Sequence, residues 1–193
     1  MDLYSEFRKY IRQIIPLSDL ELAQLQKILQ FKHIQKREHL VEMNQICDKV
    51  VFFMNGYFRF YHFSNEGIEI TSDFYFAPGF VTSYTSLITG NISKVNVQAM
   101  DEMQLLVLYK HDLEDLYQKS HAIEHLGRII AEQVAITSEK HLFSLLFQSA
   151  EERYQNLLSQ NPEFVKSIPL QYIASYLGIS PETLSRVRRK IIG

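Results

Sequence analysis

The chain has 193 residues, of which 46% are hydrophobic, which is enough for one large or two small domains with a proper core. Its longest apolar runs, such as VVFFM and LFSLLF, are too short to cross a bilayer, and its acidic start does not resemble a signal peptide, which favours the cytoplasm and argues against a membrane partner. Cys47 is the single cysteine, so an intrachain disulfide, a cysteine-rich zinc site and a four-thiolate iron–sulfur cluster are excluded.

The formal net charge is −2, but it is unevenly distributed along the chain. Residues 164–193 hold five Lys or Arg and one Glu, a local charge of +4, which leaves −6 for the remainder. A positive field confined to one segment is typical of a nucleic-acid-binding surface. The alternative is a charged face that is merely solvated.

Taken in order, the chain begins with two predicted helices and continues with strands. Residues 3–15 have a helical pattern, and Ser18 with Glu21 forms a capping box that opens a second helix. From residue 31 to about 108, short β-branched and aromatic runs are separated by turn sequences such as Asn55-Gly56 and Pro78-Gly79. This succession predicts a β-sandwich, roll or barrel.

A long helix is predicted over about residues 111–148. Apolar or small residues recur along it at intervals of three to four, at Leu126, Ile130, Val134 and Thr137. A narrow seam of this kind needs a partner, and we expect the second copy in a homodimer. The alternative is that the same seam packs against the chain's own strands.

Ser149 and Glu152 form another capping box, which opens a helix ending at Asn161-Pro162. We place the domain boundary here. The prediction is a sensor domain with its dimerisation helix over residues 1–148 and a second domain over residues 149–193.

The last segment predicts two short helices joined by a tight turn. The first has an apolar face and ends at Gly178, where a left-handed cap is needed. Ser180 is the expected N-cap of the second helix, and Pro181 suits its first position. Leu184, Val187 and Ile191 then form an apolar stripe, opposite a polar face that can reach bases and phosphates in a DNA major groove. The candidate DNA-binding residues are Gln171, Ser180, Pro181, Glu182, Thr183, Ser185, Arg186 and Arg189.

The segment IPLQYIASYLGISPETLSRVRRKI resembles the helix-turn-helix of the CRP/FNR family of bacterial transcription regulators. By this resemblance Pro181, Glu182 and Arg186 occupy base-reading positions, while Gln171, Thr183 and Arg189 lie near phosphate contacts. Pro181 replaces the family's frequent Arg or Ser. The segment CDKVVFFMNGYFRFYHFSNEGIEITSDF resembles the middle of the cyclic-nucleotide-binding β-roll of the same family.

The ligand cassette departs from that family. Its members hold the ligand's ribose and phosphate with a Gly-Glu pair and an Arg-Ser pair, where this chain has Ser83-Tyr84 and Ser93-Lys94. Each lost charge-assisted hydrogen bond is worth about 1.5–3 kcal/mol, so we do not expect cAMP to bind. No cofactor is identified. The predicted pocket is either a site for another small effector or filled by the chain's own aromatic residues, and it comprises Phe80, Thr82, Ser83, Tyr84 and Ser86.

The resemblance implies an α+β fold: an N-terminal double-stranded β-helix or jelly-roll sensor, a long dimerisation helix, and a C-terminal all-α helix-turn-helix. The expected function is a cytoplasmic, homodimeric regulator that binds double-stranded DNA at a near-palindrome, with RNA polymerase as a further partner. One alternative is a module of the same fold that binds an effector or a protein without reading DNA.

The other alternative is a metal enzyme built on the strands. His121, Glu124 and His125 match the H-x-x-E-H spacing of a zinc protease class, but a third ligand is not identifiable. His33, His39 and His62 are scattered and form no H-x-H pair, whereas a cupin-like metal site would require clustered ligands. We therefore expect no metal site and no catalytic residues, and we nominate neither Cys47 nor His62 as a haem ligand.

Overall fold

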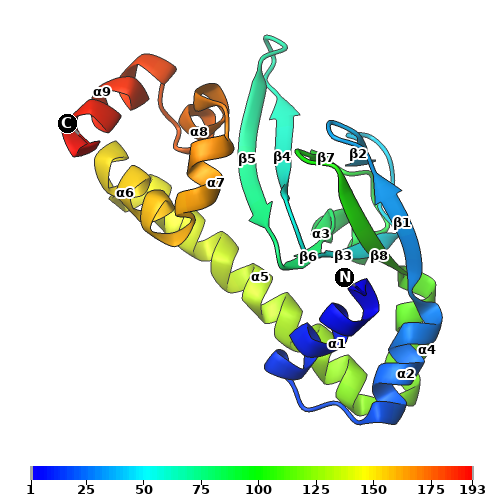
Figure 1. Cartoon of the computed structure of the whole chain (residues 1–193). Helices are drawn as coiled ribbons and strands as arrows, with labels where there is room; N and C mark the ends of the chain where they lie inside the picture. Colours follow the sequence, from blue (N-terminus) through cyan, green and yellow to red (C-terminus); the bar gives the residue numbers. More distant parts are fainter. Residues whose placement is uncertain (1, 193) are drawn as a thin grey trace. The chain divides into compact units, whose positions relative to one another are not determined.

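The computed structural model describes residues 2–192 (Figure 1). The helices are α1 (Leu3–Ile14), α2 (Asp19–Ile28), α3 (Tyr84–Thr89), α4 (Lys110–Lys119), α5 (His121–Phe147), α6 (Ala150–Gln160), α7 (Pro162–Ser167), α8 (Leu170–Tyr176) and α9 (Pro181–Ile192). The strands are β1 (Gln30–Ile34), β2 (His39–Val41), β3 (Lys49–Phe53), β4 (Tyr57–Phe63), β5 (Glu69–Phe76), β6 (Gly79–Val81), β7 (Asn96–Ala99) and β8 (Met103–Tyr109).

Contacts along the chain define two compact units. The first comprises residues up to Phe60 together with Phe74–Glu132, and the second comprises Tyr61–Asp73 together with the residues from Gln133 onward. The tip of the β4–β5 hairpin and the second part of α5 are thus grouped with the C-terminal helices. The boundary predicted at residues 148 and 149 coincides with the break between α5 and α6, and as a functional boundary it stays a prediction.

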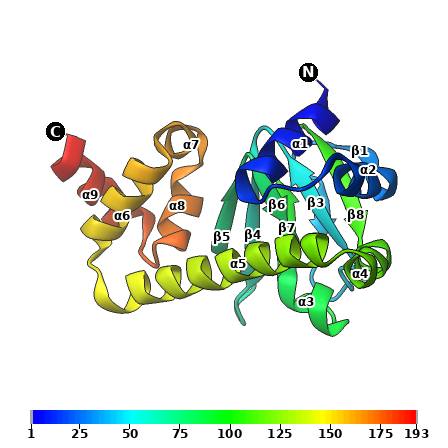
Figure 2. The same ribbon diagram turned by 90° about the horizontal axis from the view of Figure 1, so that it is seen from below.

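The first unit is built around two four-stranded sheets, with strand orders β1-β8-β3-β6 and β2-β7-β4-β5 (Figure 2). β8 pairs antiparallel with β1 and with β3, where Val51 faces Val107 across the ladder. Residues from both sheets form one buried cluster, which includes Val51, Phe53, Phe58 and Val107. This is the predicted roll, and its core lies between the two sheets.

The strands β3 and β8 are apolar on both faces because the sheet is covered on both sides. In β3, Val51 and Phe53 belong to the cluster between the sheets, whereas Phe52 belongs to a second cluster with the helices. In β8, Leu106 and Leu108 also belong to this second cluster. A strand buried on both faces reads as a continuous hydrophobic run rather than an alternating one.

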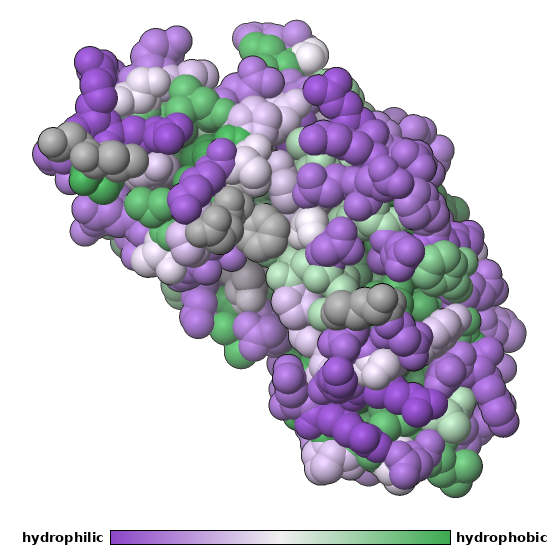
Figure 3. Space-filling model, in the orientation of Figure 1, coloured by the Kyte–Doolittle hydropathy of each residue, from purple (hydrophilic) through white to green (hydrophobic). Residues whose placement is uncertain are grey.

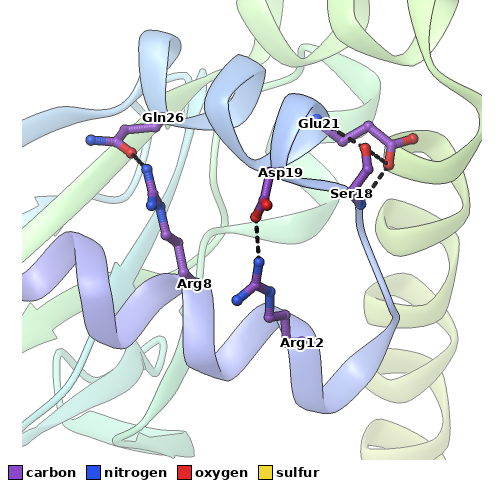
Figure 4. Close-up of polar contacts among 6 residues, drawn as sticks. All are labelled: Arg8, Arg12, Ser18, Asp19, Glu21 and Gln26. Atoms are coloured by element: carbon purple, nitrogen blue, oxygen red, sulfur yellow. Dashed lines mark hydrogen bonds and ion pairs between the residues drawn. The ribbon is translucent and has the colours of Figure 1, made fainter.

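Helices α1, α2 and α4 and the start of α5 supply the second cluster. Leu3, Phe7 and Ile11 lie one helical turn apart on α1 and are all buried in it. Polar contacts join α1 to α2 at the surface, where Arg8 donates to Gln26 and Arg12 pairs with Asp19 at 2.5 Å (Figure 4).

The predicted capping box of α2 is confirmed. The Ser18 side chain accepts a hydrogen bond from the Glu21 amide, and the Glu21 carboxylate accepts one from the Ser18 amide at 2.9 Å (Figure 4). The Ser18 hydroxyl also donates to the Glu21 carboxylate at 2.6 Å, and this bond together with the one from the Ser18 amide lowers the pKa of the Glu21 carboxyl. The same reciprocal pair forms between Ser149 and Glu152 at the start of α6.

Gly127 occupies a position in α5 where another residue would not fit. The ring of Tyr117, from α4, lies against it, and a Cβ at position 127 would stand 2.5 Å from the Tyr117 hydroxyl oxygen. A glycine inside a helix costs about 1 kcal/mol relative to alanine. Here the glycine lets the Tyr117 ring of α4 lie directly against α5, where the ring is partly buried.

The fold class is confirmed: a jelly-roll of the cyclic-nucleotide-binding type with flanking helices is followed by a long helix and an all-α C-terminal region. The short helix α7 was not foreseen, since the stop at Asn161-Pro162 was taken only as the end of α6. Among residues 2–192, no helix has the length and apolar character that a bilayer crossing needs. The face shown in Figure 3 is mostly hydrophilic, with hydrophobic residues in small groups.

Candidate functional site

The turn between α8 and α9 has the geometry that the sequence predicts. Gly178 adopts a φ of +66°, in the left-handed region. The Ile179 amide donates to the Ala174 carbonyl at 3.0 Å and the Gly178 amide donates to the Ser175 carbonyl at 3.0 Å. These two bonds form a Schellman motif, which ends α8 and turns the chain toward α9.

The first turn of α9 is capped by side chains. Ser180 accepts a hydrogen bond from the Thr183 amide at 3.2 Å, as predicted for an N-cap. Arg186 in turn donates to the Thr183 hydroxyl at 3.2 Å. Hydrogen bonds from its own amide and from the Ser180 side chain lower the pKa of the fully exposed Glu182 carboxyl, which places a negative charge at the positive end of the helix.

Helix α9 has two distinct faces. Leu184 is fully buried, and Val187 and Ile191 are partly buried. Glu182, Arg186 and Arg189 are exposed, and at 3.6 residues per turn they fall within an arc of about 60°. Of the other predicted DNA-binding residues, Gln171, Ser180 and Pro181 are exposed, and Thr183 and Ser185 are partly exposed.

Arg153, in α6, holds the end of α8 in place. Its Nε and Nη2 atoms donate to the Leu177 carbonyl at 3.0 and 2.7 Å, and its Nη1 donates to the Gln148 carbonyl at 2.5 Å. Leu177 is the C-cap of α8, directly before the turn into α9. The sequence analysis missed this residue, because nothing in its local pattern says which carbonyls a lone arginine reaches.

Two further contacts in the C-terminal unit were missed. The His141 ring, in α5, stacks on the Tyr176 ring of α8 with a centroid distance of 4.5 Å and an interplanar angle of 12°. The buried residue Thr71, in β5, donates its amide hydrogen to the Ser175 hydroxyl of α8 at 2.8 Å. Both contacts join residues far apart in sequence, which a periodicity analysis does not detect.

Three hydroxyl groups of the predicted effector pocket, those of Thr82, Ser83 and Ser86, form hydrogen bonds within the chain. Thr82 donates to the Lys49 carbonyl at 2.8 Å, and the hydroxyls of Ser83 and Ser93 lie 2.8 Å apart. Ser86 accepts from the Cys47 amide at 2.8 Å and donates to the Asn91 carbonyl at 2.6 Å. These hydrogen bonds stabilise the loops around α3.

Phe80 does not join the other four predicted pocket residues, so that part of the prediction is wrong. Its ring contacts Phe52, Tyr10 and Phe7, with centroid distances of 5.3, 5.9 and 6.2 Å. These residues belong to the cluster of the helical layer. Phe80 lies in β6 next to the inward-facing Val81, and neighbouring side chains on a strand point to opposite faces.

Aromatic rings also fill the space between the two sheets. Phe53 meets Phe58 edge to face with centroids 5.0 Å apart, and Phe60 meets Tyr75 at 4.7 Å. Tyr84, by contrast, is 39% exposed. The existence of an effector and the exclusion of cAMP stay predictions.

The predicted dimer seam is partly wrong. Leu126 is buried and Ile130 packs against the helical cluster of the chain's own first unit, which was the alternative considered. Val134 is partly exposed and Thr137 is exposed. The reason is that the first part of α5 packs against the chain's own helical cluster. The dimer role of Val134 and Thr137 stays a prediction.

A different face of α5 is both apolar and exposed. Ile136, Phe143 and Phe147 are 46%, 47% and 79% exposed, and they fall within an arc of about 40°. The rings of Phe143 and Phe147 contact each other at a centroid distance of 5.8 Å. Leu142 and Leu146 extend the exposed apolar surface.

The residues with metal-ligand spacing do not gather into a site. The His121 Nδ1 atom lies 3.1 Å from Glu124 Oε2 on the exposed start of α5. Within residues 2–192, no three His, Cys, Asp or Glu side chains come close enough together to hold a metal ion. Cys47 is buried, and its Sγ lies 3.3 Å from the Lys49 carbonyl.

The roll, together with α3 and α4, matches the family model described as the cyclic nucleotide-binding domain over residues 31–120. This part of the chain is therefore similar to that family. The match spans β1 to the end of α4 and so includes the whole of the cassette around α3. The roll matches this family model along its strands, while the chain has no arginine over residues 60–127.

Solved structures extend the likeness to the C-terminal helices. FixK2 from Bradyrhizobium japonicum is 17% identical with a TM-score of 0.73, covering 86% of this chain and 85% of its own. The c-di-GMP-responsive global regulator CLP from Xanthomonas campestris is 14% identical with a TM-score of 0.70, covering 91% and 92%. The catabolite activator protein of Thermus thermophilus is 20% identical with a TM-score of 0.58, covering 92% and 85%.

These likenesses show a shared fold, that of CRP/FNR-type transcription regulators. A search of curated protein sequences gives no match. The similarity of the roll to the cyclic nucleotide-binding domain therefore rests on the family model, and that of the helices that follow it rests on their fold.

Proposed function

We propose that this protein is a DNA-binding transcription regulator of the CRP/FNR type, working in the cytoplasm, rather than an enzyme. The observation that carries the proposal is the exposed arc of Glu182, Arg186 and Arg189 on α9. An α-helix fits the major groove, where arginine can pair with guanine and glutamate can accept from the cytosine amino group. The fold shared with FixK2 and CLP supports this reading of the arc.

The start of α9 is suited to approach the DNA backbone. Ser180 and Gln171 are exposed beside the turn, and hydroxyl and amide groups contact phosphate oxygens and so fix the register of a helix on the duplex. The Thr183 hydroxyl bonded to Arg186 restricts the arginine side chain, which reduces the entropy lost when that arginine docks on a base.

The protein acts as a homodimer in this proposal. The exposed face of Ile136, Phe143 and Phe147 is apolar, and a second copy of α5 would bury it. A two-fold dimer places two recognition helices about 34 Å apart, one turn of DNA, and so predicts a near-palindromic operator. The prediction for Ile136→Glu is a shift toward monomers in analytical ultracentrifugation. The control is Ser138→Glu, which places the same charge at an exposed position on the opposite side of α5 and should keep the oligomeric state.

We propose that any effector of the roll is not cAMP, and that RNA polymerase is a further partner of the DNA-bound protein. The Ser83 and Ser93 hydroxyls bond to each other, and they lie in the two stretches where the family has its Gly-Glu and Arg-Ser pairs. A cyclic phosphate bound there would lack the bidentate arginine that such an anion needs.

The deciding experiment is selection of binding sites from random DNA by the purified protein, followed by affinity measurements over a range of salt. We expect an enriched two-half-site sequence and an affinity that falls steeply with salt, because neutralised phosphates release counterions. Unselective binding that persists when the selection is repeated in cell extract would instead favour a module of this fold that does not read DNA.

A further inference from the structure

His141 lies where protonation of its ring would change the packing of the helix-turn-helix on α5. Its ring lies half-buried on α5 and is stacked on Tyr176 of α8, nearly parallel, at 4.5 Å between centroids. Tyr176 is the last residue of α8, immediately before the C-cap Leu177 and the turn into α9. The stack therefore ties α5 to the end of the helix that positions the recognition helix.

Arg153 binds the same region from α6. Its guanidinium donates two hydrogen bonds to the Leu177 carbonyl and one to the Gln148 carbonyl. Leu177 caps α8 and Gln148 follows the last residue of α5, so one cation serves the carbonyl ends of two helices, where the helix dipole favours positive charge. Arg153 thus positions α8, and through the turn also α9, relative to the end of α5.

The titratable groups around the His141 imidazole come from three helices. Arg153 faces it from α6 and the Tyr176 ring from α8, while Glu139 and Lys140, its neighbours on α5, are exposed. Burial of the imidazole and the positive charge of Arg153 lower the pKa of His141. The folded arrangement therefore favours the neutral form of the His141 ring.

We propose that His141 is a protonation switch on the helix-turn-helix. A proton on its ring places a second cation beside Arg153 and weakens the hydrogen bonds of Arg153 to the Leu177 and Gln148 carbonyls. Helices α8 and α9 are then released from α5. The expected loss of DNA affinity rests on the proposed function, because recognition helices released from α5 lose their fixed spacing. The loosening of α8 and α9 at low pH does not depend on the proposed function.

The direction of the pH effect follows from the lowered pKa. Because the unfolded chain takes up the His141 proton more readily than the folded one, the stabilisation is complete above the ordinary histidine pKa of about 6.5 and is lost as the pH falls below it. DNA binding by a passive basic surface would change in the opposite direction, since acid makes the protein more positive.

The test compares the full-length wild type with His141→Phe, His141→Gln and the matched control His121→Gln, which alters a histidine whose side chain is 91% exposed on the same helix. Phe keeps a flat ring for Tyr176, and neither replacement at 141 takes up a proton. Amide hydrogen exchange in α8 and α9 and fluorescence anisotropy with a random-sequence duplex are recorded between about pH 8 and about pH 5.5, a range that spans the histidine titration.

In the wild type and in His121→Gln we expect lower protection factors in α8 and α9 at the acid end, where the protection factor is the intrinsic, pH-dependent exchange rate of a free amide divided by the observed rate. We also expect DNA affinity to be about fivefold lower or more, the lower limit of typical coupling between sites. Both trends should flatten in His141→Phe and His141→Gln. Identical pH profiles in the wild type and both variants at 141 would overturn the switch. If the protein binds no DNA at any pH, the proposed function fails, and the exchange profiles still decide the switch.

Discussion

The cassette around α3 and the exposed arc of α9 are both rich in polar side chains, but these are directed differently. In the cassette, the Ser86 hydroxyl accepts a hydrogen bond from the Cys47 amide and donates one to the Asn91 carbonyl, and the hydroxyls of Ser83 and Ser93 bond to each other. On α9, Glu182, Arg186 and Arg189 point to solvent above a fully buried Leu184. The buried serine hydroxyls of the cassette stabilise the fold, whereas the polar groups of α9 stay exposed to a partner even where, as in Arg186 and Glu182, they make local hydrogen bonds.

The largest expected effect concerns the support of the exposed arc. Leu184→Ala removes the fully buried side chain of α9 and should destabilise the C-terminal unit by about 2–5 kcal/mol through lost burial and a cavity. Urea denaturation followed by a probe in α9 measures it. The exposed Leu20, which is 72% exposed on α2, is the control, and Leu20→Ala should change stability by about 0.5 kcal/mol or less. Equal effects at both positions would contradict the two-faced description of α9.

The cassette should respond to mutation as a structural element. Ser86→Ala leaves the buried Cys47 amide without its acceptor, which costs about 1–3 kcal/mol of folding stability. Thr85→Ala, at the exposed neighbouring position, serves as the control and should be close to neutral. Thermal unfolding distinguishes the two variants. A Ser86→Ala protein as stable as wild type, with altered ligand response, would show that the hydroxyl serves a ligand instead.

Arg186→Ala tests the exposed arc itself. Since Arg186 is exposed, folding stability should stay within about 0.5 kcal/mol of wild type, while affinity for the selected operator falls by about 1–3 kcal/mol and the preference at one position in each half-site relaxes. The control is Arg188→Ala, which removes the same charge from the same helix outside the arc. If Arg186→Ala weakens binding to all sequences equally, the residue contacts phosphate and does not read a base.

The sequence predicted local features well because they depend on neighbouring residues. Gly178 at the end of α8, Ser180 at the start of α9 and the Ser18–Glu21 box all depend on chemistry within a few positions. The Ile136 and Phe143 face of α5 was missed, because a helix with apolar residues on two faces does not reveal which face its own domain covers.

Long-range features were the ones that the sequence left undetermined. Phe80 was assigned to the pocket from its position in the cassette, but the pleat of β6 directs it toward Phe52. The hydrogen bonds of Arg153 and the stack of His141 on Tyr176 join helices that are far apart in sequence and meet only in the folded chain. The fold class was predictable because a family-like pattern of strands and turns specifies it, whereas the partner of each side chain is set by packing.

The smallest expected effect lies at the edge of the exposed arc. The Glu182 pKa is lowered by hydrogen bonds from its own amide and from Ser180, so its contribution to stability is present above the ordinary glutamate pKa and is lost as the pH falls through the lowered value. Glu182→Gln should therefore lower the melting temperature slightly at neutral pH and leave it unchanged near pH 2. Glu66→Gln, at an exposed hairpin position, is the control. A Glu182→Gln effect that persists unchanged into acid would show that Glu182 acts through packing rather than charge. It would contradict the view that the carboxylate stabilises α9 by its charge at the helix start.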